Sequence, residues 1–583
     1  MTIRKRMTVR AGFMGFILIW LQDPCYSLEP PRSGELDRYT LDGSIAERLS
    51  HARKLANDKV SSRLIYNLAR KYNLAPVLMA PPPAWQGGLP ASGNPKTVVL
   101  LVDFPDYPHD LNITAASVAK QFFGEGTSLN YPYESLRSYY QRSSYNSLNI
   151  AGNVLDWYRA KHARSYYQEI NARLGDGAGQ EALMMEVIDH HNAQGHDFTQ
   201  YDNNNDGVIE SLFIKWTGPD NGWSGFWWAY QWSWHSNPGF MVDGKKLSAY
   251  VWSWIAVVGQ TGYDPHVDIH ETGHLLGLPD YYDYDPDVGP DGGVGGLDMM
   301  DHNWGDHNAF SKALLGWLTP TLVGSRSATI TLDPSGTSPH AVMIMPCASG
   351  SLFGEFFIAQ YRKRGAGNDP LYSSPNYFPG RPDYPPYPTD GLLIWHVDGT
   401  LDATGRDYLY NNQYTAHKLI SLVEADGLGQ IEASSAFADA GDFYNSPTTF
   451  GPTTNPNSNR YNGSATEVAI TGLSASGGSS MSASFAVEIP PTSLLIDGFR
   501  WVGEGGSRPY TATATYDDGT TATVTPTWSE NSDFATISTA GILNASAVTG
   551  NRRVTITASY TSAGVTASAT KSVLILDRPQ KRR

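Results

Sequence analysis

The stretch that decides the interpretation runs His270-Glu271-Thr272-Gly273-His274-Leu275-Leu276-Gly277-Leu278-Pro279-Asp280. Its two histidines stand four residues apart, so on a helix they share one face and both imidazoles can reach one metal ion. Glu271 lies beside them, where it can hold and deprotonate a metal-bound water. Gly277 lets the helix end and the chain turn back, which can deliver the carboxylate of Asp280 as a third ligand. The stretch predicts a metal site, and the alternative is an exposed helix with two ordinary histidines.

A glycine-rich turn follows downstream and runs into two methionines, Gly295-Gly296-Leu297-Asp298-Met299-Met300. In metal peptidases with a shortened active-site helix, a methionine turn forms an apolar floor beneath the metal. After the histidine stretch this turn predicts such a floor. The alternative is that Met299 and Met300 are plain core residues.

A third signal is the loop between Asp202 and Glu210, DNNNDGVIE. It places the oxygen-bearing side chains of Asp202, Asn204, Asp206 and Glu210 around a glycine turn, as loops that wrap a hard cation do. The twelfth position of the loop is Phe213, so this is not a complete EF-hand. The loop predicts a structural Ca²⁺ ion, and the alternative is a polar turn.

Composition limits the class of protein. The 583 residues are 41% hydrophobic and carry a formal net charge of -15. A length of this kind predicts several domains with real cores. The negative charge argues against nucleic acid or an anionic membrane surface as a partner, because both require a basic face.

The N-terminus predicts export. A basic start, with Arg4, Lys5 and Arg6, precedes an apolar run from Gly12 to Leu21 that is short for a membrane span. We expect a signal peptide over residues 1–27, and the alternative is an uncleaved anchor. No later segment is long and apolar enough to cross a membrane. If Cys25 leaves with the signal, Cys347 stands alone and no intrachain disulfide can form.

Changes of pattern along the chain predict its domains. Residues 28–95 are predicted to form a prosegment, with helical spacing over 45–72, followed by a proline-rich linker. Residues 96–320 mix a buried strand (97–102), a strand (148–158) and helices (135–142 and 181–191), which predicts an α+β catalytic domain, with α/β as the alternative. Short strands over 321–489 predict a β-sandwich, strongly alternating strands over 490–578 predict an immunoglobulin-like module, and residues 579–583 form a tail. An aromatic run over 223–234 favours core, with a substrate cleft as the alternative.

Several motifs together resemble the immune inhibitor A-like family of bacterial metallopeptidases, within the metzincin group. The motifs are HETGHLLGLPDYYD, LDMM, AFSKALLGWLTP, VVLLVDFPD, GLLIWHVD and LISLVEADG, and they span about residues 96–488. The resemblance implies a metzincin-like fold, His270, His274 and Asp280 as Zn²⁺ ligands, Glu271 as general base and Met300 as the turn methionine. His302 stands where many metzincins carry an oxyanion-stabilising tyrosine, and we expect it to donate to the oxyanion. The terminal module is similar to bacterial immunoglobulin-like domains.

These observations predict a secreted, monomeric zinc endopeptidase that acts on protein or peptide substrates and is made as a zymogen. The prosegment has no cysteine after the signal, so a thiolate cannot hold it on the metal. The terminal module is expected to serve attachment or spacing, with a cell-surface or matrix ligand. Two rivals remain open: a surface adhesin whose peptidase domain is no longer catalytic, and a metal hydrolase that acts on a non-peptide bond.

Overall fold

The computed structural model describes residues 33–72, 88–255, 257–258, 262–283, 292–324, 326–345, 350–371, 387–413, 417–434, 437–516 and 519–577. The predicted signal peptide, Cys347, the proline-rich part of the linker and the tail lie outside these ranges. Over the described residues, none of the helices combines the length and the apolar character that a membrane crossing needs. The helices are α1 (Ser33–Asp42), α2 (Ile45–Leu55), α3 (Ser62–Lys71), α4 (Ala115–Phe122), α5 (Leu136–Ser143), α6 (Arg164–Leu174), α7 (Ala178–Ala193), α8 (His266–Leu276), α9 (Met299–His302), α10 (Ala309–Leu314) and α11 (Gln430–Ser434).

An N-terminal region is built on a mixed sheet that runs in the order β2-β1-β4-β6-β5, with β3 also pairing with β1. All pairs are parallel except β5 with β6. The strands are β1 (Lys96–Asp103), β2 (Ala151–Val154), β3 (Tyr158–Arg159), β4 (Val208–Trp216), β5 (Tyr230–Ser233) and β6 (Lys246–Trp254). A short hairpin, β7 (Val257–Val258) with β8 (Gly262–Tyr263), precedes α8.

Helices cover both faces of this sheet, which explains its continuously apolar strands. In β1, Val99 and Leu101 join a core with α4, α5 and α8, whereas Val98 and Leu100 join a second core with α7. The region is therefore an α/β layered arrangement, which is the alternative that the sequence left open and not the α+β class that it favoured. The predicted helices at 135–142 and 181–191 are confirmed as α5 and α7. The predicted strand over 148–158 is two short strands, because β2 and β3 pair with different parts of β1.

The aromatic run over 223–234 is core. Its members Trp223, Trp227, Trp228, Tyr230 and Trp234 are all at most 4% exposed and belong to the core on the α7 side of the sheet. Trp227 stacks on Trp252 of β6, with ring centroids 5.1 Å apart. The apolar area of these rings holds the sheet to its covering loop.

The chain then forms a second region, which consists of two all-β sheets that share a core. One has the order β14-β13-β12-β11-β9 and the other β10-β16-β15, and Val342, Phe357, Val468 and Phe485 represent the core between them. In β13, Leu393 and Trp395 instead join the core that contains α4, α5 and α8. The strands are β9 (Thr321–Val323), β10 (Arg326–Leu332), β11 (Val342–Ile344), β12 (Glu355–Arg362), β13 (Gly391–Asp398), β14 (Ile420–Leu422), β15 (Val468–Thr471) and β16 (Met481–Val487).

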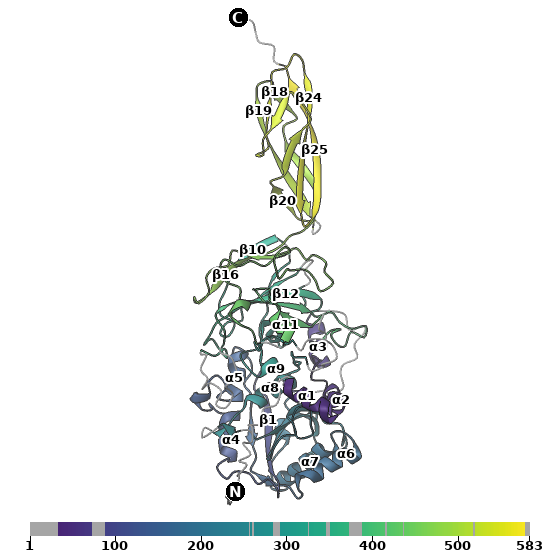
Figure 1. Cartoon of the computed structure of the whole chain (residues 1–583), viewed down its shortest axis with the longest axis vertical. Helices are drawn as coiled ribbons and strands as arrows, with labels where there is room; N and C mark the ends of the chain where they lie inside the picture. The colour runs from purple at the N-terminus through teal and green to yellow at the C-terminus, as the bar shows by residue number, and fades with distance from the viewer. Residues whose placement is uncertain are drawn as a thin grey trace, which may run out of the picture.

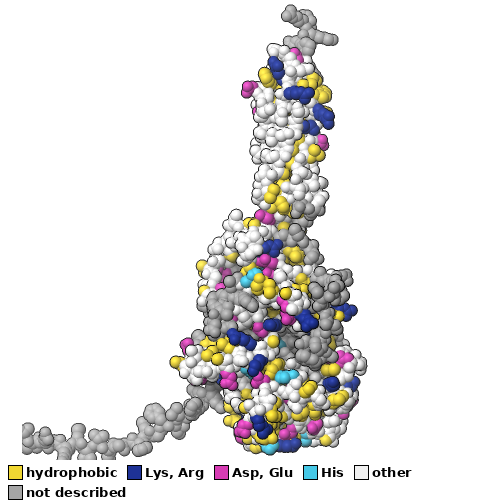
Figure 2. Space-filling view, turned by 90° about the vertical axis from the view of Figure 1, so that its right-hand side faces the viewer, with side chains coloured by type: hydrophobic (Ala, Val, Ile, Leu, Met, Phe, Trp, Pro, Cys, Tyr) yellow, Lys and Arg dark blue, Asp and Glu magenta, His cyan; other side chains and the backbone are white. Residues whose placement is uncertain are grey.

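The C-terminal part forms a third region, a separate pair of sheets that lies at one end of the elongated molecule (Figure 1). Ala512, Val554 and Val573 represent the core between the two sheets. Figure 2 shows lysine, arginine and acidic side chains interspersed over the face turned to the viewer. The strands are β17 (Pro491–Gly498), β18 (Trp501–Gly503), β19 (Ser507–Tyr516), β20 (Thr521–Val524), β21 (Thr527–Glu530), β22 (Ala535–Ile537), β23 (Ile542–Ala545), β24 (Arg552–Ser562) and β25 (Val565–Leu576).

Helices α1 to α3 pack onto the N-terminal region instead of forming a unit of their own. Leu49 and Leu55 of α2 join the core on the α7 side of the sheet. Ile65 and Leu68 of α3 join the core on the other side, together with Leu275 of α8. The helical spacing predicted over 45–72 is therefore confirmed as two helices, α2 and α3, broken between Ala56 and Ser61.

Candidate metal centre

Helix α8 carries the histidine stretch, and all its residues from Val267 to Leu276 are buried. The helix ends at Gly277, whose φ of 106° lies in the left-handed region that glycine adopts without strain. The N–H of Gly277 donates to the carbonyls of Gly273 and His274, and the N–H of Leu278 donates to Gly273 at 2.9 Å. The chain thus turns back sharply, as the sequence predicted.

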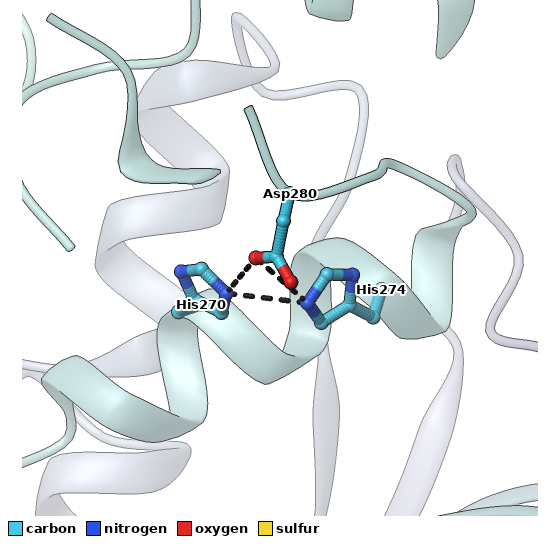
Figure 3. A group of neighbouring side chains, drawn as sticks. All are labelled: His270, His274 and Asp280. Carbon is cyan, nitrogen blue, oxygen red and sulfur yellow. Dashed lines mark hydrogen bonds and ion pairs between the residues drawn. The ribbon is translucent and has the colours of Figure 1, made fainter. Parts of the chain in front are cut away.

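That turn brings three side chains together (Figure 3). The Nε2 atoms of His270 and His274 are 3.2 Å apart. Oδ1 of Asp280 lies 3.0 Å from Nε2 of His270 and 3.4 Å from Nε2 of His274. All three residues are buried, and they form one of the groups of described residues able to hold a metal ion. His270, His274 and Asp280 are called the metal group below.

Backbone carbonyls orient both imidazoles. Nδ1 of His270 lies 2.9 Å from the carbonyl oxygen of Met299, and Nδ1 of His274 lies 2.9 Å from that of Leu278. A carbonyl can only accept, so each Nδ1 carries a proton, and in the neutral imidazole each Nε2 then presents a lone pair. Two lone pairs and a carboxylate oxygen then face one another, an arrangement that suits Zn²⁺ with nitrogen and oxygen ligands.

The electrostatics of the group agree with this fit. Burial opposes ionisation of Asp280, but the two imidazoles outweigh it and keep its pKa below the usual value. Burial also opposes protonation of His274, but Asp280 outweighs it and raises the pKa of His274 to about 9.

Glu271 is buried beside this group, and its carboxylate is poorly satisfied. Neither oxygen has a hydrogen-bond partner of normal geometry among the described residues, although the N–H of Gln231 in β5 is close enough to lower its pKa slightly. Burial dominates, and the pKa of Glu271 rises to about 8. A buried carboxylate without partners requires an explanation, and a water shared with a metal ion supplies one.

Met300 lies directly against the helix, at Gly273. A Cβ atom placed on Gly273 would meet Sδ of Met300 at 2.2 Å, and Met300 is fully buried. The same short turn also lies against the metal group at two places. The Met299 carbonyl accepts from His270, and the Met300 carbonyl accepts at 2.9 Å from the N–H of Tyr281, the residue after Asp280. The glycine in the histidine stretch is thus explained by the room that the methionine needs.

We expect Gly273→Ala to lower the stability of the chain. The added methyl group overpacks the Met300 contact, which typically costs about 1–3 kcal/mol, and better helix propensity returns about 1 kcal/mol. The double variant Gly273→Ala/Met300→Ala should lose less stability than the sum of the single variants, as measured by urea unfolding. Additive losses would contradict the contact.

A buried ion pair fixes α8 to the sheet, and our sequence analysis did not identify it. Nζ of Lys215 in β4 donates to both oxygens of Asp268, at 3.0 and 2.8 Å, and to Oγ of Ser253 at 2.8 Å. Both charged side chains are fully buried. The available signal was a single lysine inside the otherwise apolar end of a strand.

The loop over 202–210 holds its carboxylates without converging them on one point. Oδ2 of Asp202 accepts from Nζ of Lys245 at 2.7 Å and from the N–H of Gly207 at 2.9 Å. Oε2 of Glu210 accepts from Asn203, and Oδ1 of Asp206 accepts from Val208. The carboxylates of Asp202, Asp206 and Glu210 are not in a group of described acidic or histidine side chains placed to hold a metal. The Ca²⁺ site there stays a prediction.

His302 ends α9, next to the methionine turn. Its Nδ1 lies 3.1 Å from Oδ1 of Asp301, and its ring packs on Phe437 with centroids 4.5 Å apart. Asp301 in turn accepts from the N–H groups of Val294 and Gly296. These contacts hold the ring in place, and its role toward an oxyanion stays a prediction.

A cavity of about 430 Å³ opens between α8 and the N-terminal segment. Its lining includes His274 and Leu278 of the metal stretch, Gln231 and Trp232 of β5, and Asp407 of the second region. Its remaining wall comes largely from residues 54–62, between α2 and α3. The segment that precedes β1 therefore closes the space beside the metal group.

Comparison with known proteins places the chain near one class. Its sequence is distantly and partially similar to metalloproteases, although no family model matches it. It is 26% identical over 232 residues to the pre-pro-metalloprotease PrtV of Vibrio cholerae, covering 32% of this chain and 25% of that protein. It is 24% identical over 232 residues to immune inhibitor A of Bacillus thuringiensis subsp. alesti, covering 33% and 34%. The chain thus matches about a quarter to a third of these relatives' length.

Proposed function

We propose that this protein is a secreted zinc endopeptidase that hydrolyses peptide bonds of extracellular proteins and is made as a zymogen. One observation carries the proposal: two imidazole nitrogens and a carboxylate oxygen converge in a buried group beside the unsatisfied carboxylate of Glu271. The similarity to metalloproteases over part of the chain supports the same reaction.

His270, His274 and Asp280 would hold the zinc ion. When bound, zinc supplies Lewis acidity that polarises the scissile carbonyl and acidifies a water. Glu271 then takes a proton from that water and passes it to the leaving amine. A pKa raised by burial suits this exchange, because the carboxylate gains affinity for the proton that it must carry. His302 is the proposed donor to the oxyanion.

The substrate would lie along β5. This strand ends the order of the mixed sheet, so its outer edge can pair with an extended peptide. Gln231 of β5 is the residue whose N–H lies close to Glu271. A peptide paired with this edge would pass beside the general base and the metal group.

The wider architecture is proposed on the same footing. Residues 96–320 would form a metzincin-like catalytic domain with Met300 as its methionine floor, 321–489 a β-sandwich and 490–578 an immunoglobulin-like module. The signal peptide over 1–27 would direct export. The paired sheets that share buried cores in the second and third regions support these boundaries.

Residues 28–95 would keep the enzyme latent by occupying its cleft. The carbonyl of Asn57 accepts from the N–H of Asp280 at 2.7 Å, and the N–H of Ser61 donates to the carbonyl of Gly277 at 2.9 Å. Nδ2 of Asn57 reaches the carbonyl of Gln231 at 3.4 Å, on the strand proposed to bind substrate. Asn411 of the second region donates to Asp58 at 2.6 Å. The turn between α2 and α3 is therefore held from both sides of the cleft.

Arg48→Ala should weaken this latency. The guanidinium of Arg48 donates to the carbonyls of Asn221, Gly222 and Trp223. Loss of such charged hydrogen bonds costs about 1.5–3 kcal/mol, so we expect the variant to show at least about 10-fold more activity before processing. Fluorogenic peptide cleavage by the unprocessed chain measures it. Arg70→Ala, on the exposed face of α3, is the matched control, and equal latency of the two variants would contradict the contact.

The function is tested with the mature enzyme, by zinc analysis together with casein hydrolysis before and after a zinc chelator. We expect about one zinc per chain, hydrolysis that stops with the chelator, and recovery when zinc returns. Protein without zinc and without casein cleavage after prosegment removal would favour the adhesin instead.

A further inference from the structure

Three carboxylates meet in the second region, away from the ligands of the proposed zinc site. Glu424 and Asp426 follow β14, and Asp442 ends a short 3-10 turn over Ala440–Asp442. Each of the three places one oxygen within 4.8 Å of the oxygens of the other two. Glu424 and Asp442 are buried, at 5% and 1% exposure, whereas Asp426 is open to solvent.

The hydrogen bonds of the group leave one buried oxygen unsatisfied. The two oxygens of Glu424 accept from the N–H groups of Gln430 and Ile431, at 2.7 and 3.2 Å. Oδ2 of Asp442 accepts from the N–H of Asp439 at 2.7 Å. Oδ1 of Asp442 is buried and has no hydrogen-bond partner among the described residues. A buried carboxylate oxygen of this kind, close to two further carboxylates, points to a cation-binding site.

The charges around Asp442 act in the same direction. The carboxylates of Glu424, Asp426 and Asp439 all lie close enough to act on the charge of Asp442. The approach of Asp426 depends on a glycine, because a Cβ on Gly441 would lie 2.6 Å from Oδ2 of Asp426. The backbone thus lets like charges come close, which is unfavourable unless a cation lies between them.

We propose that Glu424, Asp426 and Asp442 form a Ca²⁺ site. The donors are carboxylate oxygens only, which suit a hard cation and not the nitrogen and sulfur preferences of softer metals. The exposed side of Asp426 leaves room for the water ligands that complete calcium coordination. This site is distinct from the loop over 202–210, whose carboxylates accept from Lys245 and from backbone N–H groups.

Calcium here would support the floor of the active site. The segment between Glu424 and Asp442 contains α11, which lies near α9 in Figure 1. The N–H of Ala438 donates to the carbonyl of Gly295 at 2.9 Å, and Phe437 packs on His302. Fixing both ends of the segment on one ion would hold these contacts against the glycine-rich turn that precedes Met300. Calcium would therefore stabilise the methionine turn from outside the catalytic region.

The test uses the full chain carrying Glu271→Gln, so that self-cleavage cannot occur, after calcium removal with a calcium-selective chelator. Calcium binding is measured by titration calorimetry and by the unfolding temperature. Terbium luminescence gives a second readout, because the buried Tyr444 lies two residues beyond Asp442 and can act as the sensitiser. The variants are Asp442→Asn, the exposed-site Asp426→Asn, and Asp206→Asn in the other acidic loop. Asp333→Asn, at a half-exposed aspartate of the same region, is the control.

We expect saturating calcium to raise the unfolding temperature of the parent and of the Asp333→Asn and Asp206→Asn chains by about 5 °C. Asp442→Asn and Asp426→Asn should lose that rise, one calcium equivalent and the terbium signal. Without calcium, Asp442→Asn should be at least as stable as its parent, because it removes repulsion between like charges. Unchanged calcium stoichiometry in both site variants would overturn the proposal. Loss of the calcium-dependent rise in unfolding temperature in Asp206→Asn alone would also overturn it.

Discussion

Glu271→Gln is expected to lower kcat by about 10²–10⁴-fold while the zinc content stays at one per chain. The amide keeps the size and the burial of the glutamate, but it cannot accept the proton of the attacking water. His270, His274 and Asp280 are untouched, so the ion should remain bound.

The measurement combines the rate of casein or fluorogenic peptide cleavage with metal analysis of the same sample. Glu169→Gln, an exposed residue of α6, is the matched control and should retain full activity. A Glu271→Gln enzyme that keeps near wild-type turnover would exclude Glu271 as the general base. Loss of zinc together with activity would show that Glu271 acts by holding the site together instead.

Lys215→Met is expected to destabilise the N-terminal region by about 3–5 kcal/mol, because it leaves the charge of Asp268 buried without its partner. Both side chains are fully buried, and burial already raises the pKa of Asp268 against the attraction of Lys215. Asp268 lies two residues before His270 on α8, so the pair positions the helix that carries the metal group.

Urea unfolding, followed by the fluorescence of the buried tryptophans, measures this loss in the Glu271→Gln background. Lys120→Met, on the exposed face of α4, should change stability by less than about 0.5 kcal/mol. The double variant Lys215→Met/Asp268→Leu should recover most of the loss, because it removes both charges. If Lys215→Met costs no more than Lys120→Met, the pair contributes nothing to the position of α8.

The features predictable from sequence are those that short-range geometry sets. Two histidines four residues apart on a helix must share a face, and Gly277 must end that helix, so the convergence with Asp280 follows from one turn of chain. The buried strand at 97–102 and the helices α5 and α7 follow in the same way from apolar periodicity. The loop over 202–210 shows the limit, since the spacing of its carboxylates does not reveal that Lys245, distant in sequence, donates to Asp202.

What the sequence determined by itself is the metal group, because its members lie within eleven residues and depend on local backbone geometry. Only the tertiary structure decided which atoms surround that group: the Met299 carbonyl, the Met300 thioether against Gly273, the Lys215–Asp268 pair and the Asn57 carbonyl. It also placed Asp442 among the carboxylates that follow β14. Each of these contacts joins segments distant in sequence. Their pairing depends on how cores and sheets pack together, which residue spacing does not specify.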